Sequence, residues 1–228
     1  MKNKKILKII GILIIICAAI VGAIIVKENS EYTLEETKEL VKKSLELPDN
    51  IYLKTTYYDE NGNERGKIEN YINGDCSYVK QEANGRVNYE IFTDYNAAKL
   101  ITVMHTEEKI YIAENYPKQD VTEDSNEFIY SSKRNEQYAH LGIYQFLGRE
   151  KVNDRKCIVV SLTDNNKEGM DVTNYYIDIE NGYILKQENI KDGNVNSTII
   201  NQYYEGAVPE DIVKYNELKY ADYEKVND

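Results

Sequence analysis

The chain has 228 residues with 28 basic and 39 acidic side chains; four of its lysines precede residue 9, and every acid follows residue 26. The part that follows residue 26 holds 24 basic and 39 acidic side chains, a formal charge of −15. This charge argues against nucleic acid as a partner, because phosphate binding requires a basic face. It also opposes adsorption to an anionic membrane surface and keeps a domain soluble.

The first predicted element is an uncharged apolar run at residues 9–26, which begins at Ile9, passes through Ile16 and ends at Val26. As a helix at about 1.5 Å per residue it reaches roughly 27 Å, close to the roughly 30 Å hydrocarbon core of a bilayer. A basic tail at residues 1–8 precedes it, so the positive-inside rule predicts a cytoplasmic N-terminus. We therefore expect a single-pass protein of the cell membrane, with the bulk of the chain extracellular after a spacer at residues 27–32.

Two processed forms compete with an uncleaved anchor. A secretory signal peptide also starts basic, but its apolar core is usually about 7–15 residues long and ends at a small-residue cleavage site. Here Val21-Gly22-Ala23 is followed by further apolar residues. Lipidation at Cys17 would make the chain a lipoprotein, but Ile16 stands where that resemblance requires Gly, Ala or Ser. The sequence favours the anchor and leaves cleavage and lipidation open.

A helix is predicted next, from residue 33 to residue 48. Thr33 and Glu36 have the spacing of a capping box, and Pro48 ends the pattern. The apolar residues between them form one stripe, which needs a partner surface. We expect that surface to be the sheet that follows.

From residue 51 the apolar period changes to two, which is typical of strands. Asn-Gly pairs follow at residues 61–62, 73–74 and 84–85, and this dipeptide favours the tight turn between adjacent antiparallel strands. The sequence therefore predicts a meander with strands at residues 51–58, 67–72, 76–81, 86–92, 99–104 and 109–113.

Residues 114–137 are polar and break this rhythm. A long aperiodic segment in a compact domain is usually a functional lid or a mobile insertion. We expect a loop with a short helix at residues 122–133, with Phe128, Ile129 and Tyr130 on the lid. Strands resume at residues 141–152, 156–162, 173–179, 183–190 and 195–204, and residues 216–228 are expected to form an acidic C-terminal tail.

Three stretches carry a resemblance to a known family: FLGREKVNDRKCIVVSLTD at residues 146–164, YYIDIENGYILKQE at residues 175–188 and QYYEGAVPEDIVKY at residues 202–215. They resemble the second half of the LolA/LolB-like lipoprotein-carrier superfamily, here as a membrane-anchored bacterial member. The matching positions are Gly148, Glu150 and Val152 in one strand and Tyr176, Ile177 and Asp178 in another. The leading helix and meander at residues 33–113 are similar to the first half.

The resemblance implies a mainly β domain at residues 33–215. Its strongly curved antiparallel sheet would form a half-barrel, covered by the N-terminal helix and a lid loop. Relatives hold acyl chains of lipoproteins or lipids in the concave apolar face. Because an uncleaved anchor prevents diffusion, this chain would lift or sense a lipid within its reach and would not act as a soluble shuttle.

Apolar strand residues are the candidates for a cavity lining. The same residues would also serve as a closed core beneath the helix, and the sequence does not separate the two interpretations. The set of 21 tyrosines, against 3 phenylalanines and no tryptophan, suits a cavity mouth and cross-strand packing equally well. The candidate lining residues are Ile68, Val87, Ile91, Ile101, Val103, Val159 and Ile177.

The sequence contains no catalytic signature, so we expect no enzyme activity, cofactor or metal site. His105 and His140 are the only histidines, which is too few for a zinc site without other close ligands. No Gly-x-Ser-x-Gly motif is present. Cys76 and Cys157 lie in strand-like runs, and a disulfide between them stays open.

Two functions follow from these patterns. The first is a membrane-tethered, non-catalytic binder of a lipid or of the acyl chain of an acylated protein, outside the cell. The second is an anchored sensor or interaction module that contacts another envelope protein through sheet edges or its acidic surface. An open apolar cavity would favour the first, and a cavity plugged by tyrosines or by the N-terminal helix would favour the second.

Overall fold

The computed structural model describes residues 30–118, 122–137, 143–166 and 169–227. Contacts divide the chain into Met1–Thr33 and Leu34–Asp228. The basic N-terminal tail at residues 1–8, the predicted anchor at residues 9–26 with Cys17, and His140 lie outside the described residues. Within the described ranges, no helix has the length and apolar character that crossing a membrane requires.

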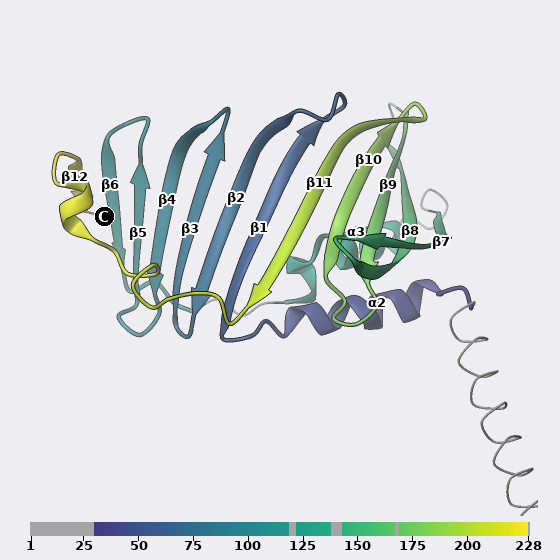
Figure 1. Cartoon of the computed structure of the whole chain (residues 1–228), viewed down its shortest axis with the longest axis horizontal. Coiled ribbons are helices and arrows are strands. Elements are labelled where there is room, and N and C mark those ends of the chain that lie inside the picture. The colour runs from purple at the N-terminus through teal and green to yellow at the C-terminus, as the bar shows by residue number, and fades with distance from the viewer. Residues whose placement is uncertain (1–29, 119–121, 138–142, 167–168, 228) are drawn as a thin grey trace, which may run out of the picture. The chain divides into compact units, whose positions relative to one another are not determined.

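One sheet dominates the unit Leu34–Asp228 (Figure 1). Its strands are β1 (Asn50–Asp59), β2 (Glu64–Asn73), β3 (Cys76–Ala83), β4 (Arg86–Asp94), β5 (Lys99–Met104), β6 (Lys109–Glu114), β7 (Tyr144–Val152), β8 (Arg155–Asn166), β9 (Gly169–Asp178), β10 (Ile184–Lys191), β11 (Asn194–Glu205) and β12 (Glu224–Asn227). Their order is β12-β6-β5-β4-β3-β2-β1-β11-β10-β9-β8-β7. The predicted mainly β fold with a curved, open sheet is thus confirmed.

Two meanders build the sheet. Strands β1 to β6 form the first and β7 to β11 the second, and every pair within them is antiparallel. The two meanders join where β1 pairs with β11, from Ile51 opposite Glu205 to Asp59 opposite Ser197. The pattern of Asn-Gly turns predicted each meander, because these turns are local. The pairing of β1 with β11 connects segments about 150 residues apart and has no local signal.

Two α-helices accompany the sheet, α2 (Leu34–Lys42) and α3 (Glu127–Gln137), together with the short 3₁₀ helices η1 (Lys43–Leu45), η2 (Glu123–Ser125) and η3 (Glu217–Tyr220). Helix α3 begins where the Asn126 side chain accepts the backbone N–H groups of Phe128 and Ile129. Phe128 is buried edge-to-face against Tyr175 of β9, at 5.2 Å between ring centroids. These contacts fix α3 on one face of β9 and β10, behind the sheet in Figure 1.

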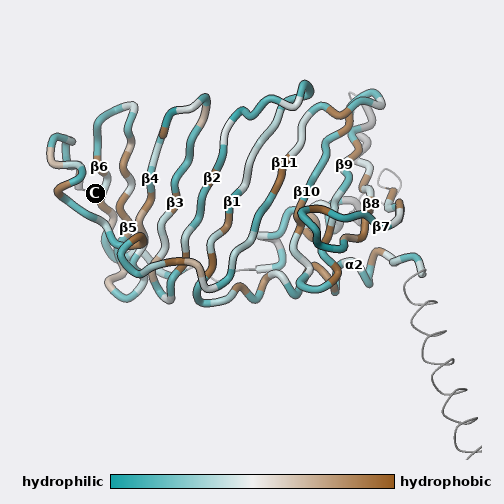
Figure 2. The backbone as a smooth tube through the Cα atoms, in the orientation of Figure 1, coloured by the Kyte–Doolittle hydropathy of each residue, from teal (hydrophilic) through white to brown (hydrophobic). Residues whose placement is uncertain are grey.

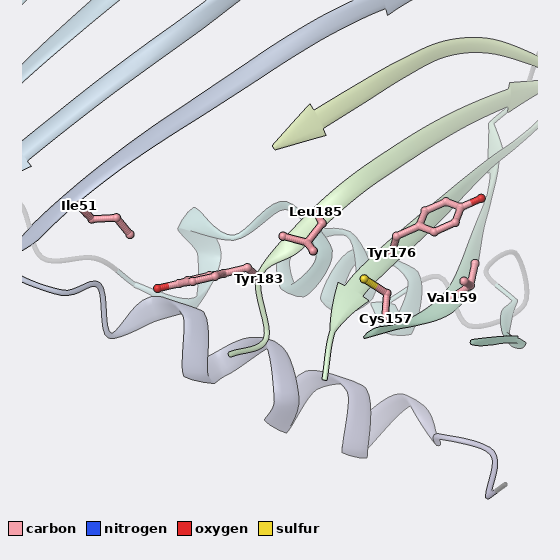
Figure 3. Close-up of a cluster of buried hydrophobic side chains, with 6 residues drawn as sticks. All are labelled: Ile51, Cys157, Val159, Tyr176, Tyr183 and Leu185. Carbon is pink, nitrogen blue, oxygen red and sulfur yellow. The ribbon is translucent and has the colours of Figure 1, made fainter. Parts of the chain in front are cut away.

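Helix α2 lies against the turn between β9 and β10. Gly182 in that turn has φ +73°, and a Cβ atom there would lie 1.9 Å from the carbonyl oxygen of Leu40. The helix and the turn therefore touch backbone to backbone, and only glycine permits this approach. Beside this contact lies a buried cluster contributed by β1, β8, β9, β10 and the turn (Figure 3): Ile51, Cys157, Val159, Tyr176, Tyr183 and Leu185.

The C-terminal residues 216–227 do not form the expected tail. Tyr220 of η3 is buried in a second cluster with Phe92, Ile101, Val103 and Ile110. Strand β12 then pairs in parallel with β6 at the edge of the sheet. Figure 2 shows the hydrophobic stretches of β5 and β6 beside this segment. Its aromatic residues are buried against distant strands, which its acidic composition does not reveal.

Glu90 of β4 joins the sheet to this C-terminal segment. Its side chain is 3% exposed and accepts hydrogen bonds from Tyr78, from Tyr220 at 2.6 Å, from Lys219 at 2.9 Å and from His105 at 2.8 Å. Burial alone would raise the pKa of Glu90, but these hydrogen bonds outweigh it and lower the pKa to about 2. The ionised carboxylate is therefore a structural clamp.

We expect Glu90→Gln to destabilise the chain by about 2 kcal/mol at neutral pH, because charge-assisted hydrogen bonds in a buried site are lost. Since the folded pKa lies below the unfolded value of 4.5, the stabilisation by Glu90 is complete above about pH 4.5 and is lost as the pH falls toward 2. Urea unfolding of wild type and variant at several pH values measures this. The difference between them should shrink at about pH 3, whereas the exposed control Glu64→Gln should unfold like wild type throughout. A difference that does not depend on pH would refute the clamp.

Candidate ligand-binding groove

A single row of paired residues connects α3 to the first meander. Residues directly opposite each other in neighbouring strands have side chains on the same face of the sheet. Helix α3 contacts the first two residues of the row, through the ring of Phe128 and the carboxylate of Glu127. The row runs through Tyr175, Gln187, Ile199, Tyr57, Gly66 and Ala83.

We call the α3 side of strands β1 to β6 the open face. Among the described residues, neither α-helix lies over β2 to β6, because both are placed toward β7 to β11 (Figure 1). Most apolar side chains of this face are consequently only half-buried, although they lie in the interior of the sheet; Ile51 is an exception, because it belongs to the buried cluster in Figure 3. Leu53 and Ile72 pack against that cluster. The remaining half-buried apolar side chains are Ile68, Val79, Tyr89, Ile91, Leu100 and Met104. A continuous apolar surface of this kind is typical of a binding site.

The open face is hollowed near the turns at one end of β1 to β4. A groove of about 530 Å³ lies there, within the roughly 300–1,000 Å³ range of ligand pockets. Its floor holds the small residues Gly66 and Ala83, which pair across β2 and β3. Tyr57 and Tyr89 line it from the two flanking strands. The hollow therefore results from two small residues between two large rings.

Two polar atoms of this face have no hydrogen-bond partner. Asn70 Oδ1 and Gln81 Oε1 are both buried and unpaired among the described residues. Both residues belong to the open face, since Asn70 pairs with Val79 and Gln81 pairs with Ile68. A buried acceptor without a partner costs about 1–3 kcal/mol. A ligand with an N–H or O–H donor would remove that cost.

The charges at the groove are largely compensated. Arg65 forms an ion pair with Asp59 at 2.7 Å, and Lys67 pairs with Glu82 at 3.4 Å. Burial raises the pKa of the Tyr57 phenol, and the nearby carboxylate of Glu127 raises it further. Tyr57 therefore stays neutral and presents an apolar ring. The groove has an apolar interior with balanced charges at its rim.

The opposite face is built differently. Five rings stack across five adjacent strands, with centroids 4.6–5.5 Å apart: Tyr204, Tyr52, Tyr71, Tyr78 and Phe92. The hydroxyl of Tyr52 donates to Glu69 at 2.7 Å, and Lys80 lies 3.8 Å from the same carboxylate. These side chains satisfy one another. The tyrosines of this face pack across strands and do not line the groove.

The predicted lining residues fall on both faces. Ile68 and Ile91 lie on the open face, and Ile177 lies on the same side in the row of residues next to Tyr175. Ile101 and Val103 lie on the opposite face, buried with Tyr220. Val159 also lies on the opposite face. It pairs with Tyr176, and successive residues of a strand, such as Tyr175 and Tyr176, point to opposite faces.

Val87 also lies on the opposite face, because a register shift separates it from its neighbours. Gln81 pairs with Tyr89, but the next residue, Glu82, pairs with Val87, so Asn88 is an extra residue in β4. A bulge of this kind reverses the alternation of side chains, and a regular two-residue period does not show it. The sequence grouped Val87 with Ile91 as lining residues, and the structure places them on opposite faces.

Of the expected lid residues, Phe128 and Ile129 are buried and anchor α3, whereas Tyr130 is 52% exposed. Sequence reasoning missed the floor residues Gly66 and Ala83. An isolated glycine inside a strand often marks a close backbone approach, so Gly66 carried a usable signal. Ala83 carried none, because its role depends on its pairing with Gly66.

Other site types have no counterpart in the described residues. No group of three or more His, Cys, Asp or Glu side chains there has the arrangement of a metal site. Cys76 and Cys157 are free thiols, on β3 and β8 respectively. His105 contacts Glu90 and Tyr223, as part of the C-terminal clamp.

No family model and no curated protein matches the chain. Among solved structures it is similar to the MucA/MucB complex of Pseudomonas aeruginosa, at 14% identity over 79% of this chain and 61% of that chain, with a TM-score of 0.49. It is also similar to the lipoprotein LppX of Mycobacterium tuberculosis, at 6% identity over 76% of this chain and 97% of that chain, with a TM-score of 0.40. A LolA superfamily protein of Nitrosomonas europaea matches at 11% identity over 78% and 97% of the two chains, with a TM-score of 0.29.

The chain thus spans 61% of the length of the first of these structures. At such identities the likenesses concern the fold alone.

We expect Gly66→Ala to destabilise the chain by about 1–3 kcal/mol, since it forces the backbone apart. A Cβ atom at Gly66 would lie 2.5 Å from the carbonyl oxygen of Glu82 in the neighbouring strand, and this backbone atom cannot move aside cheaply. Thermal or urea unfolding measures the loss. Gly74→Ala provides a contrast, because its added Cβ has nothing within 4 Å and only the strain of φ +59° applies. Full stability of Gly66→Ala would contradict the close approach at the groove floor.

Proposed function

We propose that the chain is a membrane-tethered, extracytoplasmic and non-catalytic binding protein, which holds an acyl chain of a lipid or lipoprotein on its open face. The observation that carries the proposal is the apolar groove between Tyr57 and Tyr89, continuous with half-buried side chains such as Ile68 and Ile91. A sheet surface offers an acyl chain many dispersion contacts. Each CH₂ group that leaves water contributes about 0.8 kcal/mol.

The dimensions of the open face suit such a ligand. Between β1 and β5 there are four strand spacings of about 4.8 Å, roughly 19 Å in all. An extended chain lying across the strands would contact the row Leu53, Asn70, Val79, Ile91 and Thr102. The apolar members of this row, Leu53, Val79 and Ile91, would exclude water from one side of the acyl chain.

The unpaired acceptors define the ligand further. Asn70 Oδ1 and Gln81 Oε1 both belong to the face that the acyl chain would cover. A plain hydrocarbon would leave them unpaired, at a cost that opposes binding. An amphiphile with a hydroxyl or amide N–H near its acyl chain would donate to them. We therefore favour a lipid or acylated protein with such a donor.

The tether is the second part of the proposal, and it rests on the apolar run at residues 9–26. A tethered domain stays within reach of one membrane, so it would lift or sense a lipid locally. The formal charge of −15 after this run would keep the domain from lying on an anionic bilayer surface.

A second candidate function is protein binding through the edge strand β7. Among the described residues this strand pairs with β8 alone, and it stands at the end of the strand order. Leu147 on β7 is 46% exposed, and Ile143 just before the strand is 60% exposed. A sheet edge with exposed apolar side chains is suited to adding a strand from another protein.

We expect Ala83→Phe to weaken acyl binding at least tenfold, because the added ring fills the groove while Ala83 itself is only half-buried. The full chain in lipid nanodiscs would be titrated with the fluorescent cis-parinaric acid, with empty nanodiscs subtracted. Thr198→Phe is the matched control, since it adds the same ring on the opposite face, where Thr198 pairs with Tyr58. Equal binding by all three proteins, or none by wild type, would count against the groove.

We expect proteinase added to intact cells to degrade the domain, because the basic residues 1–8 place it outside. A C-terminal epitope tag followed by immunoblotting measures this, with a cytoplasmic protein as the control for lysis. Protection of the tag until the cells are lysed would reverse the proposed orientation.

A further inference from the structure

A second hollow lies on the opposite face, beneath the C-terminal segment. Its volume is about 380 Å³, large enough for a small organic molecule. Strands β3 to β5 supply Cys76, Phe92, Lys99 and Ile101. The residues just before η3 supply Lys214 and Tyr215. This pocket is separate from the groove, because Phe92 pairs with Tyr78 and Ile101, on the face opposite to Ile91.

Aromatic and aliphatic side chains form part of the pocket wall. The rings of Phe92 and Tyr215 meet edge-to-face, with centroids 5.5 Å apart. Tyr215 also stacks on Tyr220, at 5.6 Å between centroids and 5° between planes, and Tyr220 is held by Glu90. Phe92 and Ile101 are themselves buried. The space between these groups suits a flat apolar ring.

One polar atom of the pocket lacks a partner. The Tyr215 hydroxyl is buried and has no hydrogen bond among the described residues. Burial raises the pKa of this phenol, so it keeps its proton and can donate it in a hydrogen bond. An acceptor on a bound molecule would satisfy it.

The charges around the pocket leave one cation available. Lys214 is paired with Glu210 at 2.5 Å, and Asp94 accepts the backbone N–H of Ala97 at 3.0 Å. Lys99 lies opposite Asp94 and Glu114 in the register and lowers the pKa of the Glu217 carboxyl, but among the described residues it forms no close ion pair. Burial raises the pKa of the Cys76 thiol, so the thiol is neutral and does not repel an anion. The pocket thus combines an ammonium that lacks a close ion pair, an unpaired phenol, the Asp94 carboxylate and a wall of apolar side chains.

We propose that this pocket is a second binding site, which takes a small aromatic or otherwise flat apolar carboxylate. The ring lies against Phe92 and Ile101, and the carboxylate accepts the Tyr215 hydroxyl proton in a hydrogen bond and faces the Lys99 ammonium. The site does not depend on the acyl function, because it uses the other face of the sheet. Since Val213, Lys214 and Tyr215 line the pocket and lead directly into the C-terminal segment, an occupied pocket would also stabilise that segment.

The test uses the full chain in nanodiscs and 2-naphthoate as the probe. Calorimetric titration should show 2-naphthoate binding, with uncharged 2-naphthamide about tenfold weaker because the ion pair is lost. Lys99→Gln and Tyr215→Phe should each weaken naphthoate binding about tenfold. Lys191→Gln is the control, since Lys191 is exposed on β10, away from the pocket. Both pocket variants are conservative, and circular dichroism verifies that they fold.

Alkylation of Cys76 provides an independent readout. Bound naphthoate should slow its reaction with iodoacetamide, measured by peptide mass spectrometry, while Cys157 is 0% exposed and should stay unlabelled in the folded protein. Ala83→Phe should leave naphthoate binding unchanged, which separates this site from the acyl groove. Three results would each overturn the proposal: absence of naphthoate binding, wild-type affinity in both pocket variants, or an unchanged rate at Cys76.

Discussion

The pairing of β1 with β11 is the interaction on which the rest of the structure depends. It joins two meanders into one sheet, so that the residues opposite each other form rows running from β9 to β4. Without this pairing, α3 would cover the meander of β7 to β11, and the groove would lie on the separate meander of β1 to β6. Because the rows are continuous, the helix that contacts Tyr175 and the groove that contains Gly66 lie on the same surface. A single constraint of register thus places the helix cover and the binding surface side by side.

The two faces are then completed by different segments. On one side, α3 covers only the strands around Tyr175 and leaves the first meander open. On the other, the C-terminal segment covers the first meander, and Glu90 secures it by accepting hydrogen bonds from both Tyr78 and Tyr220. The chain therefore has a closed core and an exposed apolar surface in the same strands. This division allows a rigid sheet to keep one face available for a ligand.

The sequence predicted features that depend on neighbours in the chain. Asn-Gly turns identified the meanders, and the helical period before Pro48 identified α2. It did not predict features that depend on distant pairing. Val87 changed face because of one extra residue, and Tyr220 was assigned to a tail because its partner Glu90 lies 130 residues earlier. The groove floor likewise requires Gly66 to meet Ala83, a matter of register that neither residue reveals alone.

The central claim is that an acyl chain lies on the open face, and covalent mapping of a bound acyl chain tests it most directly. A fatty acid with a diazirine in its acyl chain would be photolysed with the full chain in nanodiscs, and the labelled residues identified by mass spectrometry. The account predicts that labels concentrate on open-face residues such as Ile68, Ala83 and Ile91. Labels confined to the opposite face or to β7, or equal labelling of all surfaces, would contradict it.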